Sequence, residues 1–371
     1  MDSPPRAALV HEWLVRWGGS ESVLVSLSRI LGDAPIHTLV HHPDERVEAA
    51  FRGRVVRASG LTHLPGASRL YPAALPVMPD IWRRTQARAQ ELVLSSSHAF
   101  CKGIDTRGVT HVCYCHTPPR YLWDLSQEYV GEMSHVLARP LLGYLKARDR
   151  EAADGVDHFI ANSSFVADRI RRAYGRGAHV IYPPVDVQRF VPRELPRRHF
   201  LAGGRLVRYK RVDRAIAAAN ETSLPLIVFG DGPDRGRLEA MAGPSVRFVG
   251  PCTNDQLLEL MQGAIALVFP GVEDFGILPV EAQAAGTPVV AFARGGAVET
   301  VADERTGVLY SEDSLECLSD AWITARDRHW DAAECRRNAE RFSRRRFEHE
   351  MIDFLTRIGF QPPGQLSSDW P

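Results

Sequence analysis

Short apolar runs alternate with amphipathic stretches from the start of the chain. The run at residues 7–10 is followed by a Gly-Gly turn and then by residues 22–30, in which apolar side chains recur at helical spacing. A short apolar run predicts a buried strand, and the periodic stretch after it predicts a helix. Further strands of the first half are predicted at residues 36–40, 55–58, 92–95, 110–115, 158–161 and 179–181.

The second half repeats this alternation. Strands are predicted at residues 200–203, 226–229, 246–249, 265–269 and 288–291, and helices at residues 211–219, 235–242, 254–262 and 279–285. Strands separated by helices are typical of parallel sheets covered by helices on both faces. The pattern therefore predicts an α/β protein with two doubly wound, Rossmann-like domains.

The length of the chain and its prolines suggest where these domains divide. The 371 residues exceed the ~250 residues at which single cores stop growing. A proline-rich passage around residues 184–198 cannot continue a helix or a central strand, and we place the hinge there. We assign residues 1–190 to an N-terminal domain and residues 191–345 to a C-terminal domain. Residues 346–371 are predicted to form a helix that returns toward the N-terminal domain, followed by a frayed tail.

Charge is balanced overall but unevenly distributed. The first 190 residues carry 23 basic and 19 acidic residues, and the rest of the chain carries 22 and 26. Basic clusters in the first half could meet an anionic membrane surface or an acidic acceptor, although a solvated surface is the simpler reading. No apolar run approaches the ~18 residues that span a bilayer, and no signal pattern opens the chain. We predict a cytoplasmic protein, with peripheral contact at the inner membrane face left open, and no nucleic-acid partner.

Two loops of the first half carry candidate binding residues, because ligands of open α/β sheets bind beyond the carboxyl ends of strands. Gly18 and Gly19 follow the first strand and open a helix, where backbone amides can approach an anionic ligand; a tight turn is the alternative. His116 directly follows the strand at residues 110–115 and is placed to touch substrate. Its alternative is a structural hydrogen bond to a backbone carbonyl. The aromatic residues beyond His116 suit a sugar ring or a core equally well.

The first loop of the second half combines glycines and cations between a strand and a helix. Arg205 offers a planar fork of donors and Lys210 a compact charge, so together they could neutralise a leaving nucleoside diphosphate without a metal ion. No Asp-x-Asp pair is present to hold a divalent cation, and the six cysteines show neither disulfide nor zinc-site spacing. We therefore expect no metal and no cofactor. An ordinary basic helix start is the alternative, although cations there oppose the helix dipole.

The most informative segment is EDFGILPVEAQAAGTP, which begins at Glu273. Glu273 lies in the loop after the strand at residues 265–269, and Glu281 is expected in the first turn of the following helix. The exposed amides of Phe275, Gly276 and Ile277 add donors for phosphate, while an acid one turn into the helix can reach ribose hydroxyls.

The segment GDGPD at residues 230–234 invites a dinucleotide-site assignment. Its glycines lack the G-x-G-x-x-G spacing, and a proline interrupts them. We interpret the segment as a structural turn, which disfavours a nicotinamide-dependent dehydrogenase.

Together these segments resemble retaining glycosyltransferase family four, whose members adopt the GT-B fold, over nearly the whole chain. The most specific element is the E-x7-E signature from Glu273 to Glu281, followed by Gly295-Gly296. Supporting elements are GGSE, HTPPRYLWD, ANSSFVADRI, YPPVDVQRF and GGRLVRYKR. The resemblance implies two Rossmann-like domains facing a central cleft, with the donor bound by the C-terminal domain and the acceptor recognised mainly by the N-terminal domain.

The resemblance also implies roles for single residues. Arg205 and Lys210 match the diphosphate-binding pair, Glu281 matches the acid that binds the donor ribose, and Glu273 matches the acid facing the donor sugar. His116 matches the family's active-site histidine. The amides that complete the donor site would come from Phe275, Gly276 and Ile277.

Further roles are implied for the loops. Gly19 with Gly18 matches the flexible glycine loop near the phosphates, and the base is expected near Val207 and residues 250–257. Acceptor recognition is expected from the N-terminal loops that include Arg16, Trp17 and residues 63–71 and 120–124.

The implied activity is metal-independent, retaining transfer of a hexose from a nucleotide diphosphate sugar to an acceptor hydroxyl, through an oxocarbenium-like state. The HTPPRYLWD, SSSHAFCKG and YPPVDVQRF segments look most like a mannosyltransferase subgroup that builds bacterial polysaccharides, which favours GDP-mannose and a glycan or lipid-linked acceptor. A UDP- or dTDP-sugar with a small-molecule or natural-product acceptor is the alternative. A nucleotide-sugar epimerase of the same fold is more distant because it lacks this E-x7-E arrangement.

Overall fold

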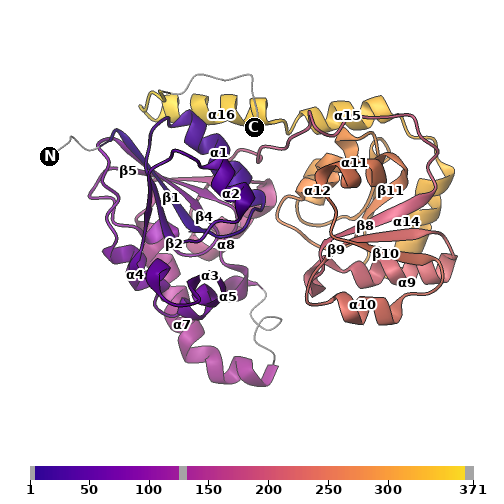
Figure 1. The fold of residues 1–371 in the computed structure, drawn as a ribbon, viewed down its shortest axis with the longest axis horizontal. Helices are drawn as coiled ribbons and strands as arrows, with labels where there is room; N and C mark the ends of the chain where they lie inside the picture. Colours follow the sequence, from indigo (N-terminus) through magenta and orange to yellow (C-terminus); the bar gives the residue numbers. More distant parts are fainter. Residues whose placement is uncertain (1–4, 125–131, 364–371) are drawn as a thin grey trace. The chain divides into compact units, whose positions relative to one another are not determined.

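The computed structural model describes residues 5–124 and 132–363. The chain divides into two compact units, which Figure 1 shows with the element labels used below. Unit 1 comprises Met1–Pro184 and Arg345–Pro371, and unit 2 comprises Val185–Arg344. The division therefore falls after Pro184, rather than after residue 190 as the sequence suggested.

Unit 1 is built on a seven-stranded parallel sheet with the order β3-β2-β1-β4-β5-β6-β7. Its core strands are buried on both faces, as expected for a sheet covered by helices on both sides. The strands are β1 (Ala7–Leu14), β2 (Ile36–His41), β3 (Val56–Ala58), β4 (Leu92–Ser97), β5 (Thr110–Cys115), β6 (His158–Ala161) and β7 (His179–Val180).

Helices cover both faces of this sheet. One apolar cluster joins the sheet to α1 (Gly19–Ile30), α2 (Glu45–Ala50) and α16 (Arg344–Arg357), and Figure 1 shows α1 beside α16. Other clusters join the sheet to α4 (Met78–Arg84), the 3-10 turn η3 (Cys101–Gly103), α7 (Glu132–Asp154) and α8 (Ser164–Tyr174). The shorter elements are η1 (Gly60–His63), α3 (Ala67–Leu70), η2 (Tyr71–Ala74) and α5 (Arg120–Trp123).

The last helix explains why the chain returns to unit 1. Phe347, Met351 and Leu355 lie four residues apart on α16, so they share one face of the helix, and each is fully buried in the unit 1 core.

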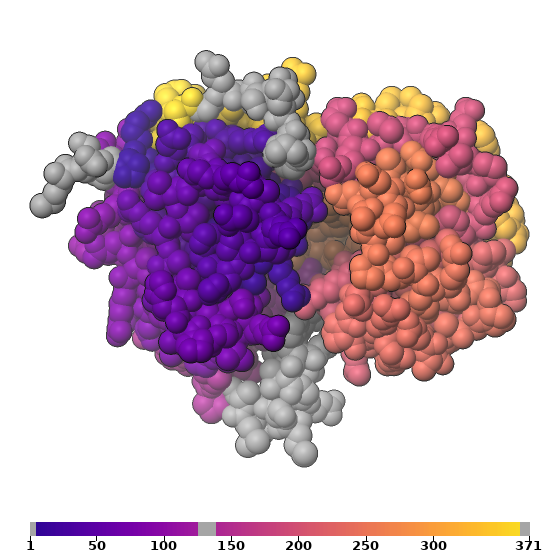
Figure 2. Space-filling model, viewed as in Figure 1, coloured from indigo at the N-terminus to yellow at the C-terminus, as the bar shows by residue number. Residues whose placement is uncertain are grey.

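In the space-filling view, the face of unit 1 turned toward the viewer is indigo to violet, the colours of the first elements of the chain (Figure 2).

Unit 2 contains a six-stranded parallel sheet with the order β10-β9-β8-β11-β12-β13. The strands are β8 (His199–Arg205), β9 (Leu226–Asp231), β10 (Val246–Gly250), β11 (Ala264–Phe269), β12 (Val289–Phe292) and β13 (Gly307–Tyr310). The edge strand β13 was not predicted.

The helices of unit 2 are largely those that the sequence predicts. A core cluster joins the sheet to α9 (Val212–Thr222), α10 (Arg235–Met241) and α14 (Leu315–Asp327). The remaining helices are α11 (Asn254–Gln262), α12 (Ile277–Ala284), α13 (Ala297–Thr300) and α15 (Ala332–Glu340), and α12 packs against α15. The helices α13, α14 and α15 were not predicted.

The strand order reverses at one place in each sheet, between β1 and β4 in unit 1 and between β8 and β11 in unit 2. Ligands of open parallel sheets bind beyond the carboxyl ends of strands at such points. The loops after these four strands are therefore the first places to look for a site. Among the described residues, no helix combines the length and apolar character needed to cross a membrane.

Candidate active site

The loop after β8 is shaped by two glycines. Gly203 and Gly204 have φ angles of 148° and 103°, which favour glycine. A Cβ at Gly203 would lie 2.1 Å from the Phe229 carbonyl oxygen, so only glycine fits between β8 and β9. Arg205 ends β8 with an exposed side chain, and no described residue forms an ion pair with it. The fold therefore presents a guanidinium at the carboxyl end of a central strand.

Lys210 lies in the short 3-10 turn before α9 and meets the loop that follows β11. Its Nζ is 2.8 Å from Glu273 Oε1, and the two side chains are 18% and 21% exposed. The two loops touch because Gly271 has no side chain: a Cβ there would lie 2.8 Å from Lys210 Cα. The structure thus joins two predicted site residues that are far apart in the sequence.

A second pair of glycines supports the loop around Glu273. The Gly296 amide donates a hydrogen bond to the Glu273 carbonyl at 2.8 Å. Cβ atoms at Gly295 and Gly296 would lie 2.4 Å from the Glu273 carbonyl oxygen and 2.3 Å from Phe275 Cα. These glycines therefore have a packing role in shaping the site.

The start of α12 completes the site of unit 2. The Phe275 ring is buried, which fixes the loop, and Gly276 is the N-cap with a φ angle of 88° and no side-chain cap. No described residue accepts a hydrogen bond from the amides of Gly276 or Ile277. Such amides at a helix N-terminus favour an anionic ligand.

The predicted position of Glu281 needs one correction. The helix begins at Ile277 rather than at residue 279, so Glu281 lies in the second turn, and the first turn contains no acid. A proline is accepted inside the first turn because its missing N–H has no helical partner there. Glu281 is half-buried and lies one helical turn beyond the amides of Gly276 and Ile277.

The turn at residues 230–234 is built for packing. A Cβ at Gly230 would lie 1.9 Å from the Gly204 carbonyl oxygen, and one at Gly232 would lie 2.3 Å from the Leu206 carbonyl oxygen. Asp234 pairs with Arg237 at 2.7 Å, and this hydrogen bond lowers the pKa of Asp234. The acids of this turn thus hold the turn itself together.

In unit 1, His116 lies directly after β5 and takes part in a chain of polar contacts. His116 Nε2 is 2.8 Å from Ser96 Oγ on β4. Ser96 Oγ is 3.2 Å from His11 Nδ1 on β1, and His11 Nε2 is 3.2 Å from Glu21 Oε1 on α1. The strand register explains this chain, since His11 pairs with Ser96. The His116 ring therefore contacts a side-chain hydroxyl, and not a backbone carbonyl as in the alternative that the sequence left open.

Burial controls the charge state of this cluster. Burial lowers the pKa of His116 well below its usual value, and the nearby His98 and His11 lower it further. Burial alone would raise the pKa of Glu21, but the hydrogen bond and charge of His11 outweigh it and lower the pKa. His116 is thus neutral and Glu21 ionised at neutral pH.

A second acid of β1 has a structural role. Glu12 is fully buried and accepts hydrogen bonds from the amides of Ala99 and Cys101 at 2.8 and 3.0 Å and from Ser97 Oγ at 3.1 Å. These donors hold the turn after β4. The satisfied polar groups also explain why β1 runs to Leu14, past its predicted end at residue 10.

Aromatic side chains surround the histidines. The Trp13 ring lies 4.7 Å from the rings of both Tyr71 and His98, measured between centroids. The His98 ring lies 6.1 Å from that of His116. Aromatic faces next to polar groups suit a sugar ring. The sequence pointed to Tyr71 and His116 as binding residues, but not to Trp13 or His98.

The glycine loop after β1 is tied to the same cluster. Gly18 is the N-cap of α1 and Gly19 is its first residue. A Cβ at Gly18 would lie 3.0 Å from Glu21 Oε2, which also accepts a hydrogen bond from Ser20 Oγ at 3.0 Å. The loop therefore sits against the acid that contacts His11.

Two residues of the predicted acceptor loop have structural partners instead. Trp123 Nε1 donates to Asp149 Oδ2 at 2.8 Å, and Asp124 forms an ion pair with Arg169. Arg169 also donates to Thr117 Oγ1 at 2.6 Å, which fixes the loop after His116. The polar groups of Trp123 and Asp124 are therefore already paired, and acceptor recognition by residues 120–124 stays a prediction.

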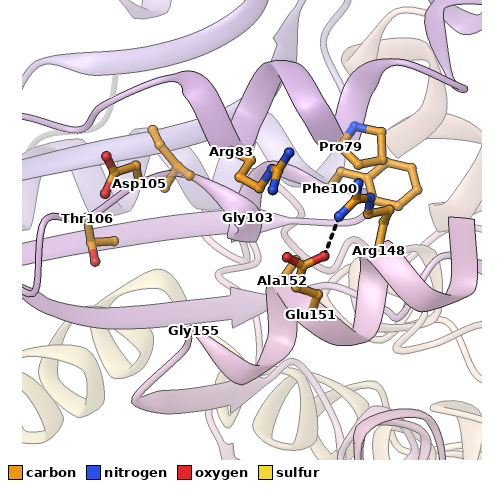
Figure 3. A pocket seen from close by; sticks show the side chains of 11 residues that line it. Pro79, Arg83, Phe100, Gly103, Asp105, Thr106, Arg148, Glu151, Ala152 and Gly155 are labelled. Carbon is orange, nitrogen blue, oxygen red and sulfur yellow. Dashed lines mark hydrogen bonds and ion pairs between the residues drawn. The ribbon is translucent and has the colours of Figure 1, made fainter.

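Figure 3 shows a separate pocket of about 350 Å³ in unit 1, lined by α4, η3 and α7. Its cations are already paired: Arg148 contacts Glu151 at 2.7 Å, and Arg83 contacts Asp80 at 3.4 Å. The pocket therefore offers no unpaired charge to a phosphate. Among the described residues, no three His, Cys, Asp or Glu side chains are grouped so that they could hold a metal ion.

Two family models match the chain, one over each unit. The model described as Glycosyltransferase Family 4 matches residues 17–189, and the model described as Glycosyl transferases group 1 matches residues 187–342. The chain therefore contains a glycosyltransferase family 4 domain and a glycosyl transferases group 1 domain.

Curated relatives of this family-four chain match over parts of their length. A D-inositol 3-phosphate glycosyltransferase of Catenulispora acidiphila is 34% identical over 187 residues, 41% of this chain and 45% of the relative. A GDP-mannose-dependent alpha-mannosyltransferase of Mycolicibacterium smegmatis is 34% identical over 178 residues, 44% of this chain and 45% of the relative. The chain thus spans about half the length of these relatives.

Solved structures agree with the fold. HepE of Anabaena, in complex with UDP and glucose, superposes with a TM-score of 0.67 at 18% identity and covers 95% of this chain and 99% of its own. Sucrose-phosphate synthase of Thermosynechococcus elongatus gives a TM-score of 0.69 at 18% identity, again covering 95% and 99%. The family-four chain therefore has the GT-B fold.

Sequence reasoning missed three polar residues of the family-four site, His11, Glu21 and Ser96. One signal was available: His11 and Glu12 interrupt an otherwise apolar strand. Polar residues inside a buried strand need partners, which makes them candidates for a site.

Proposed function

We propose that this chain is a retaining glycosyltransferase that moves a hexose from a nucleotide diphosphate sugar to a hydroxyl of a glycan or lipid-linked acceptor, without a metal ion. The observation that carries the proposal is the set of anion-binding groups in unit 2. An exposed Arg205, Lys210 beside Glu273, and the free amides of Gly276 and Ile277 follow the neighbouring strands β8 and β11. Cations and helix amides together suit a diphosphate.

The donor is proposed to be GDP-mannose. This choice rests on two relatives that are named as GDP-mannose-dependent. They are the alpha-mannosyltransferase of Mycolicibacterium smegmatis and a phosphatidylinositol monomannoside mannosyltransferase of Mycobacterium tuberculosis. The second is 30% identical over 236 residues, 55% of this chain and 61% of the relative. The alternative is a UDP- or dTDP-sugar with a small-molecule acceptor. The relatives named for D-inositol 3-phosphate favour its acceptor part.

Each group of unit 2 has a task in the proposed reaction. As the bond between the sugar and the phosphate breaks, charge builds on the departing diphosphate, where Arg205, Lys210 and the α12 amides stabilise it. The carboxylate of Glu273 lies beside Lys210 and would face the donor sugar, whose anomeric carbon becomes electron-poor. Glu281 would bind the ribose hydroxyls.

The acceptor side of the reaction is proposed for unit 1. The acceptor oxygen forms a bond to the anomeric carbon while its proton passes to the departing phosphate oxygen on the same face of the sugar. This geometry retains the configuration. His116 is neutral and would contact the donor sugar by hydrogen bonding, and the Trp13, Tyr71 and His98 rings would provide apolar contact.

Nucleotide binding tests this proposal directly. Thermal unfolding of the whole chain is recorded with GDP, UDP, dTDP or ADP, in EDTA and again with magnesium, because a nucleotide that binds the native state raises Tm. We expect GDP to stabilise the chain in EDTA. Stabilisation by UDP or dTDP instead would select the alternative donor, and strict dependence on magnesium would refute the metal-free site.

A lipid-linked acceptor would bring the enzyme to a membrane surface, and we propose the segment from η1 to α4 as the contact. Leu64, Leu70 and Val77 are 56%, 62% and 49% exposed. Arg69 and Arg84 lie among them and suit an anionic surface. Vesicle flotation tests this contact. Binding to anionic but not neutral vesicles is expected, and equal recovery with both would refute it.

A further inference from the structure

A continuous chain of contacts links a carboxylate of α1 to the ring of His116. It runs from Glu21 Oε1 to His11 Nε2 at 3.2 Å, from His11 Nδ1 to Ser96 Oγ at 3.2 Å, and from Ser96 Oγ to His116 Nε2 at 2.8 Å. Every link joins groups that exchange a proton or a hydrogen bond. The positions of the protons follow from the atoms that surround each group.

Both nitrogens of His11 face acceptors. Nε2 faces the Glu21 carboxylate, and Nδ1 lies 3.2 Å from the Ser96 backbone carbonyl as well as from its hydroxyl. A carbonyl oxygen accepts hydrogen bonds and donates none. A nitrogen without hydrogen would therefore repel it, so both His11 nitrogens carry a proton and the ring forms a buried pair with Glu21.

The direction of the Ser96 hydroxyl follows. Ser96 is fully buried, and the two ring nitrogens are the groups within hydrogen-bond distance of its Oγ among the described residues. A buried hydroxyl donates its hydrogen where an acceptor is present. His11 Nδ1 is already protonated, so the hydrogen points to His116 Nε2. Nε2 of His116 is then an acceptor, and the proton of the neutral ring lies on Nδ1.

We propose that Glu21, His11 and Ser96 are positioning residues that hold His116 as a neutral ring with its proton on Nδ1, so that it donates a hydrogen bond to the substrate. No described residue hydrogen-bonds Nδ1, and the ring is partly exposed. The choice of tautomer is made by the partner of the other nitrogen.

The electrostatic surroundings agree with a neutral ring. Burial lowers the pKa of His116 well below its usual value, and the neighbouring His98 and His11 lower it further. A neutral donor suits a sugar hydroxyl, whereas an imidazolium would repel the positive charge that develops at the anomeric carbon. The identity of the substrate that His116 contacts rests on the proposed function, but the positions of the protons do not.

The proton positions are measured by 15N NMR of the whole chain labelled at histidine. The two ring nitrogens of each tautomer have distinct shifts, and the His116→Gln variant assigns the signal among the 14 histidines. We expect the Nδ1–H form in the wild type and a larger share of the Nε2–H form in Ser96→Ala. An Nε2–H signal in the wild type, or an unchanged signal in Ser96→Ala, would overturn the proposal.

Ser95→Ala is the matched control, because it removes a similar contact on the same strand. Ser95 Oγ lies 2.9 Å from Nε2 of a different histidine, His111, so His116 should keep its signal. An equal change of the His116 signal in both variants would overturn the proposal.

Kinetics separate a positioning role from a merely structural one. With the nucleotide sugar chosen by the thermal-shift series, Ser96→Ala should lower kcat at least tenfold while the donor KM changes less than threefold. Equal losses in Ser95→Ala would contradict positioning. If the wild type transfers no sugar but shows the expected tautomer and its loss in Ser96→Ala, the proposed function fails and the proton arrangement stands.

Discussion

Replacing Lys210 with methionine tests the donor site most sharply. Methionine keeps most of the side-chain length and removes the charge that lies 2.8 Å from Glu273 Oε1. A hydrogen bond to a charged group contributes ~1.5–3 kcal/mol. Since each 1.4 kcal/mol is a factor of ten, the Kd for the nucleoside diphosphate should rise about 10- to 150-fold.

The loss of Lys210 also leaves the Glu273 carboxylate facing the diphosphate alone. Two unit charges ~6 Å apart repel by about 3 kcal/mol at an effective dielectric constant of ~20. Part of the lost affinity is therefore repulsion. The double variant Lys210→Met, Glu273→Gln should recover part of it, whereas Glu273→Gln alone should lower kcat strongly without weakening nucleotide binding.

The assay is calorimetric titration in EDTA with the nucleotide that stabilises the wild type. Arg326→Gln provides the control, because this exposed arginine pairs with Asp327 at the end of α14. Its Kd should match the wild type. An unchanged Kd in Lys210→Met, or an equal loss in Arg326→Gln, would refute the assignment of Lys210 to the diphosphate.

Three further changes test the packing and electrostatics. Gly296→Ala puts a Cβ 2.3 Å from backbone of the neighbouring loop, so nucleotide binding should be lost and unfolding free energy should fall by ~1–3 kcal/mol. Asp149→Asn breaks a fully buried 2.5 Å ion pair with Lys102 and should cost ~3–5 kcal/mol in urea unfolding. Burial lowers the pKa of His111 to about 4, below the ~6.5 of an unfolded histidine, so stability falls as the pH drops between these values. His111→Gln should remove up to ~3 kcal/mol of that fall, measured by urea unfolding across pH.

Each of these changes has a control and an opposing outcome. Gly236→Ala, with nothing within 4 Å of its Cβ, should bind nucleotide normally, and loss there too would contradict the clash argument. Asp168→Asn removes an exposed ion pair with Arg171 and should lower the free energy of unfolding by less than ~1 kcal/mol. An equally small loss in Asp149→Asn would contradict the argument that burial makes the Lys102 pair important. His349→Gln, at an exposed position, should keep the full pH dependence. If His111→Gln also keeps the full pH dependence of stability, the assignment of this dependence to His111 is wrong.

Much of the fold could be predicted from local patterns. The strands at residues 110–115 and 158–161 and the helix at residues 254–262 occur as predicted. The strand β13 and the helices α13, α14 and α15 were missed, because they form by packing against the rest of unit 2 rather than from a local periodicity. The strand β1 was predicted too short, because the partners that satisfy His11 and Glu12 lie on other elements.

The residues of the candidate site also divide into those that local sequence identifies and those that only the fold brings together. Arg205, Lys210, Glu273 and Glu281 were identified because their residue types and spacing form a local signature. The hydrogen bond from Trp123 to Asp149 could not be predicted, since it joins residues 26 positions apart. Local sequence indicates which groups are chemically suited to a ligand, but it does not show which of them the fold has already paired.

The sequence by itself determined the alternation of strands and helices, the family signature and the cations suited to a diphosphate, because these depend on residue type and short spacing. Tertiary structure alone decided that Lys210 meets Glu273, that Gly295 and Gly296 support the Glu273 loop, and that Glu21, His11 and Ser96 lead to His116. The physical reason is that the register of parallel strands brings together residues that the chain keeps far apart.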